Sequence, residues 1–121
     1  MADDIEVALK KLISGVDGLE GIVISDRDGV PVAKVLNGDV PEAASRPGFL
    51  ATFSMATEQA SKLGLGANKS LICFYDNCQV VHLNFTPLVA TLLARVDANT
   101  GVLLGMSAQL NESVQQLSDY I

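Results

Sequence analysis

Apolar residues recur at spacings of three and four in three segments of the chain, and each segment predicts an amphipathic helix. The first covers residues 3–13, the second runs from about residue 48 to 63, and the last begins after Asn99, a favourable N-cap residue. The last helix has the longest apolar stripe, formed by Leu103, Met106, Leu110, Val114, Leu117 and Ile121. Its polar face is expected to consist of Gln109, Asn111, Glu112, Ser113, Gln116 and Asp119.

Short runs rich in β-branched and other apolar residues predict five strands. These runs are residues 19–25, 30–36, 69–75, 79–85 and 88–96. Asp26-Arg27-Asp28-Gly29 separates the first two, and Gly29 can take the positive φ of a tight hairpin. Pro31 lacks a backbone N–H, which places its strand at a sheet edge. The run 88–96 does not alternate, so we expect a strand that is buried on both faces.

The order of elements is therefore helix, two strands, helix, three strands, helix. Short turns between consecutive strands favour antiparallel pairing, which gives an α+β sandwich with helices on both faces of the sheet. Residues 37–47 form the longest loop, in which Gly38, Pro41 and Pro47 oppose regular structure, and we expect this loop to be exposed. Pro47 suits the first turn of the following helix.

Composition changes this picture in one respect. The 121 residues include 8 basic and 14 acidic side chains, a net charge of 8 − 14 = −6, and suit one domain over residues 1–121. The acidic balance and the scattered basic residues argue against nucleic acid as a partner. Hydrophobic residues make up 49% and charged residues only 18%, so the chain has more apolar surface than we expect it to bury alone.

The chain also lacks the usual signals for membrane attachment. Its N-terminus starts with acidic residues, Ala2 stands where myristoylation requires glycine, and the apolar stretch 88–94 is far too short to span a bilayer. We therefore expect a soluble cytosolic domain without direct membrane insertion, which reaches a membrane only through something that it binds.

Asp76, Cys78 and His82 are the residue types of a thiol enzyme, in which a thiolate acts as nucleophile, imidazole as base and carboxylate as orienting group. However, residues four apart on a strand lie about 13 Å apart, too far for a hydrogen bond. We expect His82 to be a surface residue of its strand instead. Cys73 and Cys78 are out of register for a disulfide, so we expect two free thiols.

Two other short motifs have a similar structural explanation. Asp26-x-Asp28-Gly29 resembles the start of a calcium loop, but the later oxygen ligands are missing and a hairpin turn is expected. Gly64-x-Gly66 follows a helix rather than preceding one, so we interpret it as a helix C-cap and turn. The sequence therefore predicts no metal, no cofactor and no catalytic residues.

The run 69–75 has an unusually open edge. It contains no proline, and Lys69 is its only charged residue, so at the sheet edge its free backbone groups invite another chain unless a loop or helix covers them. The preceding helix has an apolar stripe that consists of Phe49, Phe53, Ala56, Ala60 and Leu63. Thr52, Met55 and Gln59 flank this stripe, and its alanines permit close approach of a second helix.

Four stretches resemble the family of MEK-partner scaffold subunits of the Ragulator (LAMTOR) complex, within the roadblock / dynein-light-chain superfamily. These stretches are VISDRDGVPV at residues 23–32, RPGFL at 46–50, SKLGL at 61–65 and ANTG at 98–101. The resemblance extends over the whole chain, and departures concentrate in the outer face of the last helix and at Phe85-Thr86. It implies a roadblock-like α-β-β-α-β-β-β-α sandwich with a five-stranded antiparallel sheet.

The resemblance also implies a non-catalytic adaptor, since family members dimerise through their middle helices and third strands. The implied partners are a second roadblock-fold Ragulator subunit, the lipidated anchor subunit, Rag GTPases and the MEK and ERK kinases. The implied location is the cytoplasmic face of late endosomes and lysosomes, where the complex also supports recruitment of the TOR kinase. The residues assigned to the partner surface are Phe49, Thr52, Phe53, Met55, Ala56, Gln59, Ala60, Lys69, Leu71, Ile72, Cys73, Phe74 and Tyr75.

Two alternative functions remain open at this point. Related roadblock proteins can be homodimeric regulators of small GTPases, which requires only a self-complementary interface. A thiol enzyme centred on Cys78 is the other alternative, and it requires a depressed thiol pKa.

Overall fold

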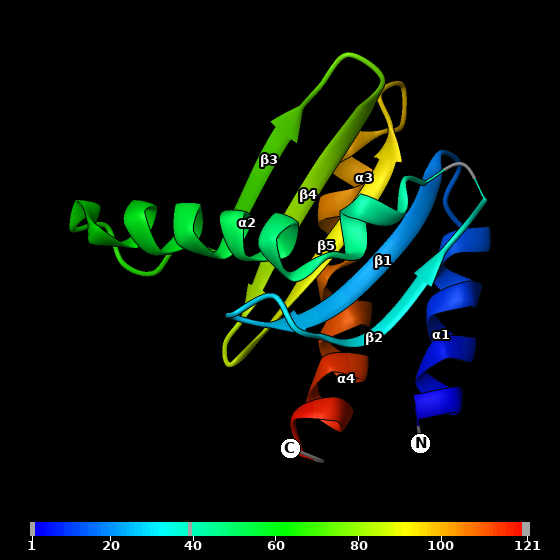
Figure 1. The fold of residues 1–121 in the computed structure, drawn as a ribbon, viewed down its shortest axis with the longest axis horizontal. Coiled ribbons are helices and arrows are strands. Elements are labelled where there is room, and N and C mark those ends of the chain that lie inside the picture. The colour runs from blue at the N-terminus through cyan, green and yellow to red at the C-terminus, as the bar shows by residue number, and fades with distance from the viewer. Residues whose placement is uncertain (1, 39, 120–121) are drawn as a thin grey trace.

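The computed structural model describes residues 2–38 and 40–119 of the chain (Figure 1). Its strands form a single five-stranded sheet in the order β2-β1-β5-β4-β3, and every neighbouring pair is antiparallel. The elements are α1 (Ala2–Ser14), β1 (Leu19–Asp26), β2 (Pro31–Leu36), the 3-10 turn η1 (Glu42–Ser45), α2 (Pro47–Ala60), the 3-10 turn η2 (Ser61–Leu63), β3 (Ser70–Phe74), β4 (Cys78–Phe85), β5 (Leu88–Arg95), α3 (Thr100–Gly105) and α4 (Ser107–Ser118). The predicted order of elements and the antiparallel pairing of strands joined by short turns are confirmed, whereas the β1–β5 pair was not predicted.

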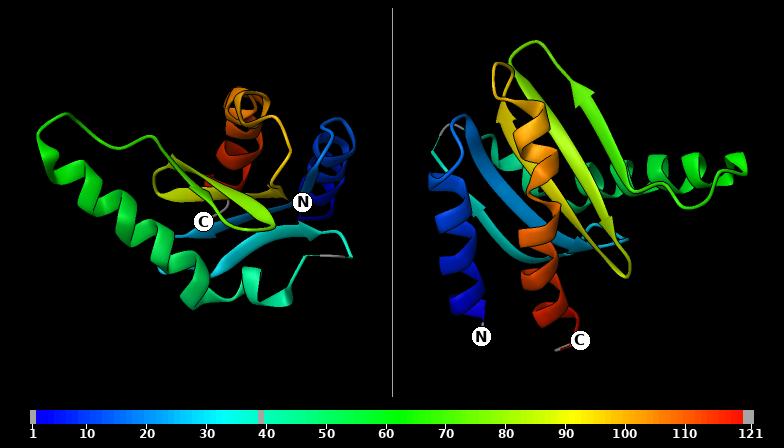
Figure 2. Two further views of the ribbon diagram at one scale, coloured as in Figure 1. Left: turned by 90° about the horizontal axis from the view of Figure 1, so that it is seen from above. Right: turned by 180° about the vertical axis from the view of Figure 1, so that it is seen from behind.

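Helices cover both faces of the sheet, as the sequence predicts. Figure 2 shows α1, α3 and α4 on one face and α2 on the other. Consecutive residues of β1 serve the two faces in turn: Ile22 and Ile24 pack under α1 and α4, while Val23 packs with Leu50 and Phe53 of α2. The central strand β5 is buried along its length except at Arg95. Each face of the sheet therefore has its own apolar core.

The β1–β2 turn is a hairpin and not a cation site. Gly29 has φ +87°, and Oδ1 of Asp26 accepts hydrogen bonds from the backbone N–H groups of Asp28 (2.9 Å) and Val30 (3.0 Å). The Asp26 carboxylate thus stabilises the turn by accepting these two hydrogen bonds. Pro31 begins β2, which forms one edge of the sheet as predicted.

Replacing Gly29 with alanine is expected to lower the free energy of unfolding by about 2 kcal/mol, because the positive φ is unfavourable for a residue with a Cβ. The added Cβ would also lie 2.1 Å from the carbonyl oxygen of Pro47, so α2 would have to shift. Gly48→Ala is a matched control, because a Cβ at Gly48 meets no atom within 4 Å. Urea unfolding of the two variants measures the difference, and equal stabilities would contradict the prediction.

The last helix differs from the prediction in being interrupted. α3 ends at Gly105 and α4 begins at Ser107, and between them the N–H of Met106 donates to the carbonyl oxygen of Leu103 (3.2 Å). Glycine has a low helix propensity, which favours this local tightening. The predicted N-cap is confirmed, since Asn99 Oδ1 accepts from the N–H of Val102 (3.2 Å).

The apolar stripe of this last segment is buried from Leu103 to Leu117, whereas Ile121 lies outside the described residues. One residue of the expected polar face is placed differently. Ser113 is buried rather than exposed, because it lies next to the buried Val114 on the side of α4 that meets the sheet.

Part of the loop over residues 37–47 forms regular structure, which the sequence did not predict. Pro41 precedes the turn η1, in which the N–H of Ala44 donates to the carbonyl oxygen of Pro41 (3.0 Å). Ala44 is buried in the α2-side core, so the loop is not simply exposed. The fixed φ of proline, which opposes a long helix, is compatible with this short turn. Pro47 occupies the first turn of α2, as predicted.

Candidate protein interaction surface

Strand β3 forms the second edge of the sheet, and the structure shows which of its backbone groups are free to pair. The N–H of Asn84 donates to the carbonyl oxygen of Lys69 (3.0 Å), and the N–H of Tyr75 donates to that of Cys78 (2.8 Å). In an antiparallel pair, alternate residues bond to the same neighbour. Ser70, Ile72 and Phe74 therefore direct their backbone N–H and C=O groups away from β4.

Helix α2 crosses the sheet and extends past β3, so its C-terminal end has no strand beneath it (Figure 1). Only Leu50, Phe53 and Thr57 of this helix are buried. Of the predicted apolar stripe, Phe53 lies on the sheet together with Leu50 and Thr57, whereas Ala56 is exposed and remains available to a partner. Because the helix meets the sheet at positions 50, 53 and 57, its other faces remain open.

The remaining predicted residues of α2 lie at or near the open faces. Thr52, Met55 and Gln59 are exposed, and Phe49 and Ala60 are half-buried. Met55 is 65% exposed, and Leu65, just after the helix, is 89% exposed. Gly64 ends the helical segment with φ +82°, which confirms the predicted C-cap. The overhanging part of α2 is thus an apolar surface that no other described part of the chain covers.

The predicted residues of β3 do not all face the same way. The side chains of Leu71 and Cys73 are half-buried against the α2-side core, whereas Ile72 packs on the opposite face. Phe74, at the end of the strand, is 62% exposed, and Lys69 and Tyr75 are also exposed. Ile72 therefore contributes its backbone, rather than its side chain, to any surface shared with α2.

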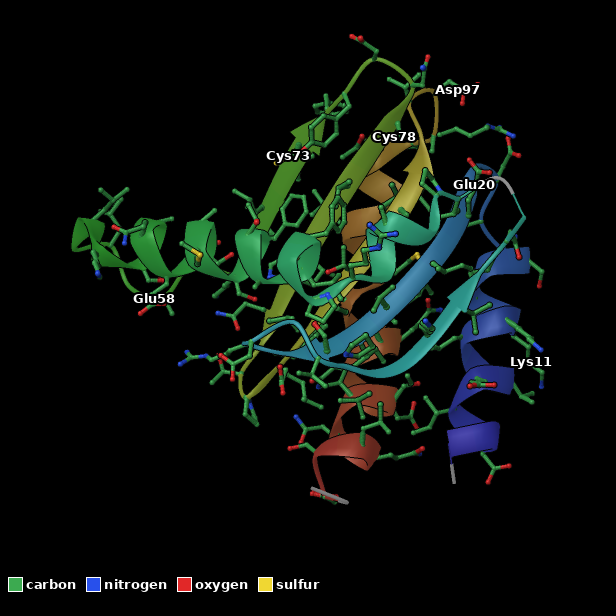
Figure 3. All side chains as sticks on the ribbon, in the orientation of Figure 1. Lys11, Glu20, Glu58, Cys73, Cys78 and Asp97 are labelled. Atoms are coloured by element: carbon green, nitrogen blue, oxygen red, sulfur yellow. The ribbon has the colours of Figure 1, made fainter. Side chains whose placement is uncertain are left out.

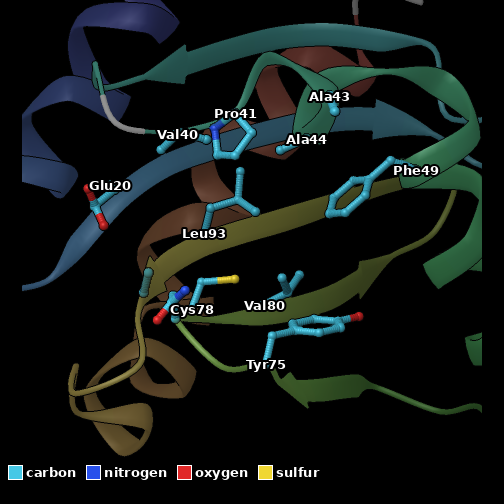
Figure 4. A pocket seen from close by; sticks show the side chains of 12 residues that line it. Glu20, Val40, Pro41, Ala43, Ala44, Phe49, Tyr75, Cys78, Val80 and Leu93 are labelled. Carbon is cyan, nitrogen blue, oxygen red and sulfur yellow. The ribbon is translucent and has the colours of Figure 1, made fainter.

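An apolar hollow of about 480 Å³ lies on the α2 face, next to the C-terminal end of β3. Figure 4 shows Phe49 and Tyr75 on two of its walls, with Val80 and Leu93 from the sheet between them. Val40 and Pro41 of the loop before η1 complete it. The sequence does not reveal this hollow, because four segments that are far apart in the chain line it.

His82 is not the surface residue that the sequence predicts. It is 0% exposed, its ring stacks on Phe53 at 5.9 Å, and its Nδ1 lies 3.2 Å from Thr91 Oγ1. Burial lowers the pKa of His82 from 6.5 to about 4. The expectation fails because strand alternation puts His82 on the face that α2 covers, and periodicity within one strand does not reveal which face is covered.

The candidate thiol enzyme finds no geometric support. His82 contacts Thr91 and Phe53, and no hydrogen bond joins it to Cys78 among the described residues. Cys73 and Cys78, which are labelled in Figure 3, are both free thiols, as predicted. The pKa of Tyr75 is raised mainly by desolvation and to a lesser extent by the neighbouring Cys73.

Residues 2–38 and 40–119 contain neither a candidate metal site nor a candidate membrane span. Within this part of the chain no three His, Cys, Asp or Glu side chains are grouped so that they could hold a metal ion. None of the helices there is long and apolar enough to cross a membrane.

Comparison with known proteins gives the same family throughout. The family model described as "Mitogen-activated protein kinase kinase 1 interacting" matches residues 3–121. The chain is 52% identical over 117 residues to the Ragulator complex protein LAMTOR3-B of Xenopus laevis, covering 97% of this chain and 95% of that one. It is 50% identical over 121 residues to the human Ragulator complex protein LAMTOR3, covering 100% and 98%.

Solved structures establish the fold. A roadblock/LC7 domain from Streptomyces avermitilis superposes with a TM-score of 0.75 at 16% identity, covering 92% of this chain and 94% of that one. A structure titled "MglB with tetrameric arrangement" gives 0.82 at 13% identity, covering 98% and 90%. These matches confirm the predicted roadblock-like α+β architecture.

Proposed function

The chain belongs to the mitogen-activated protein kinase kinase 1 interacting family, and from this we propose that it is a non-catalytic scaffold subunit of a Ragulator complex. One structural observation supports the proposal most strongly: α2 overhangs an open β3 edge and leaves exposed apolar side chains there. A second chain that adds a strand to β3 and a helix beside α2 would cover both features at once.

We assign this position to a second roadblock-fold subunit of the same complex, so that the functional unit is a heterodimer. Strand addition would supply register through the outward backbone groups of Ser70, Ile72 and Phe74. Helix contact would remove apolar area from water, at roughly 25 cal/mol per Å² before the costs of association.

The further partners follow from the family and not from the geometry. We propose that a lipidated Ragulator subunit holds the heterodimer on the cytoplasmic face of late endosomes and lysosomes. There the complex would recruit Rag GTPases and the TOR kinase and would support signalling through MEK and ERK. Such anchoring requires no membrane-spanning helix in this chain.

Co-expression with the second roadblock subunit of the same organism tests the heterodimer. We expect light scattering during gel filtration to show a stable 1:1 complex. A stable homodimer of this chain that does not exchange with the other subunit would contradict the proposal, and it would favour the alternative of a homodimeric regulator of small GTPases.

Replacing Met55 with glutamate is expected to weaken this complex about 10-fold, because a charge would be buried against the partner's apolar surface. The stability of the free chain should not change, since Met55 is 65% exposed. Val7→Glu is a matched control on α1, because Val7 is 53% exposed and lies on the other face of the sheet. Calorimetric titration measures both affinities, and equal values would exclude Met55 from the interface.

A further inference from the structure

A second hollow, of about 510 Å³, lies beneath α2 at the opposite end of the sheet from the apolar one. Arg27 and Asp28 of the β1–β2 turn, Thr86 of the β4–β5 turn and Glu58 of α2 contribute to its lining; Figure 3 labels Glu58. The hollow therefore lies between α2 and the turns at this end of the sheet.

Buried polar atoms without partners gather around this hollow. Three of the residues that line the hollow are Ser54, Thr57 and His82. Each has a buried side-chain atom without a hydrogen bond among the described residues, namely Ser54 Oγ, Thr57 Oγ1 and His82 Nε2. A fourth such atom, Ser25 Oγ, lies on the strand position paired with Val89, another lining residue. An unsatisfied buried polar group costs about 1–3 kcal/mol, so several around one hollow need a common explanation.

The chemistry of these atoms restricts what they can bind. A hydroxyl donates and accepts, and Nε2 of His82 does either, depending on which way the hydrogen bond between Nδ1 and Thr91 runs. Arg27 is offset by Asp28 and Glu58 at the rim, and no charged side chain lies among the buried groups. A charged ligand would lose its hydration without gaining a buried counter-ion.

We propose that this hollow binds an uncharged group that both donates and accepts hydrogen bonds, of which a primary carboxamide is the simplest. The group has two sources with the same chemistry, namely an Asn or Gln side chain of a docked protein and a free small molecule. Met55 lines this hollow and also belongs to the proposed partner surface, so the two sites adjoin along α2. The proposal nevertheless rests on the buried polar atoms and not on the heterodimer.

Three probes of one shape test the chemistry: acetamide is neutral, acetate is its anionic counterpart and acetamidinium its cationic one. In NMR titrations of the isotopically labelled full chain, acetamide is expected to give saturable shifts at the His82 ring nitrogens and at the amides of Ser54 and Thr57. Acetate and acetamidinium are expected to give none there. Equal responses to all three probes, or no saturable shift with acetamide, would overturn the proposal.

Variants localise the binding. Thr57→Val and His82→Leu should each weaken acetamide binding at least about 10-fold, whereas Thr52→Val should not, because Thr52 lies on the exposed side of α2 and donates to the Gly48 carbonyl oxygen. Repeating the titration on the heterodimer separates the two sources: lost binding indicates a partner side chain, and retained binding indicates a free molecule. Unchanged affinity in both hollow variants would refute the site while leaving the heterodimer untouched.

Discussion

Replacing Ile72 with proline is expected to weaken the complex with a second roadblock subunit at least about 100-fold, or about 2.7 kcal/mol. The backbone N–H of Ile72 points away from β4, so its loss leaves the β3–β4 hydrogen bonds intact. What the variant removes is a donor to an added strand, and the proline ring also obstructs the approach of that strand. The residue before it, Leu71, is already extended, as a residue before proline prefers.

Ile72→Ala is the matched control, because both variants lose the same half-buried side chain but only proline loses the N–H. We expect the alanine variant to keep most of the affinity, and both variants to keep the helical circular dichroism signal. If the proline variant co-purifies with the partner at native stoichiometry, edge pairing through β3 is wrong.

Acid is expected to destabilise the chain through His82. The pKa of His82 is about 4 in the folded chain, whereas the ordinary value of 6.5 applies to the unfolded chain. The unfolded chain therefore binds the imidazole proton more tightly. As the pH falls from 6.5 towards 4, the unfolded state takes up this proton first, and the free energy of unfolding decreases. The gap of 6.5 − 4 = 2.5 pH units corresponds to about 3 kcal/mol, and no further loss from this group follows below pH 4.

Urea unfolding at pH 7 and pH 4.5 measures this effect in the wild type and in His82→Gln. Glutamine retains hydrogen-bonding capacity but does not titrate, so the difference between the two pH dependences isolates the histidine from the carboxylates. Identical pH dependences would show that His82 accepts a proton as readily in the folded chain as in the unfolded one.

The predicted elements that agree with the structure are those specified by neighbouring residues. The β1–β2 turn depends on Gly29 and on a hydrogen bond between Asp26 and Val30, which are four residues apart. The cap of α3 joins Asn99 to Val102, three residues away. Pro31 keeps its own strand at the edge of the sheet. Such features depend on φ preferences and short-range hydrogen bonds, which the local sequence contains in full.

The features that the sequence missed depend on contacts between distant segments. The sequence did not predict which side of α2 faces the sheet, because that side is set by where the helix crosses the strands, at Leu50, Phe53 and Thr57. His82 is buried because Phe53 lies over it, across a separation of 29 residues. The sequence likewise contained no sign of the two hollows, since each is lined by segments from separate parts of the chain.

The sequence by itself determined the order of the elements, the antiparallel pairing of strands joined by short turns, the edge position of β2 and an apolar excess that pointed to α2 and β3. Only the tertiary structure decided how α2 lies on the sheet, and therefore which side chains it buries and which it leaves open. The physical reason is that periodicity defines the faces of each helix and strand, while the packing of one element on another selects the face that is covered.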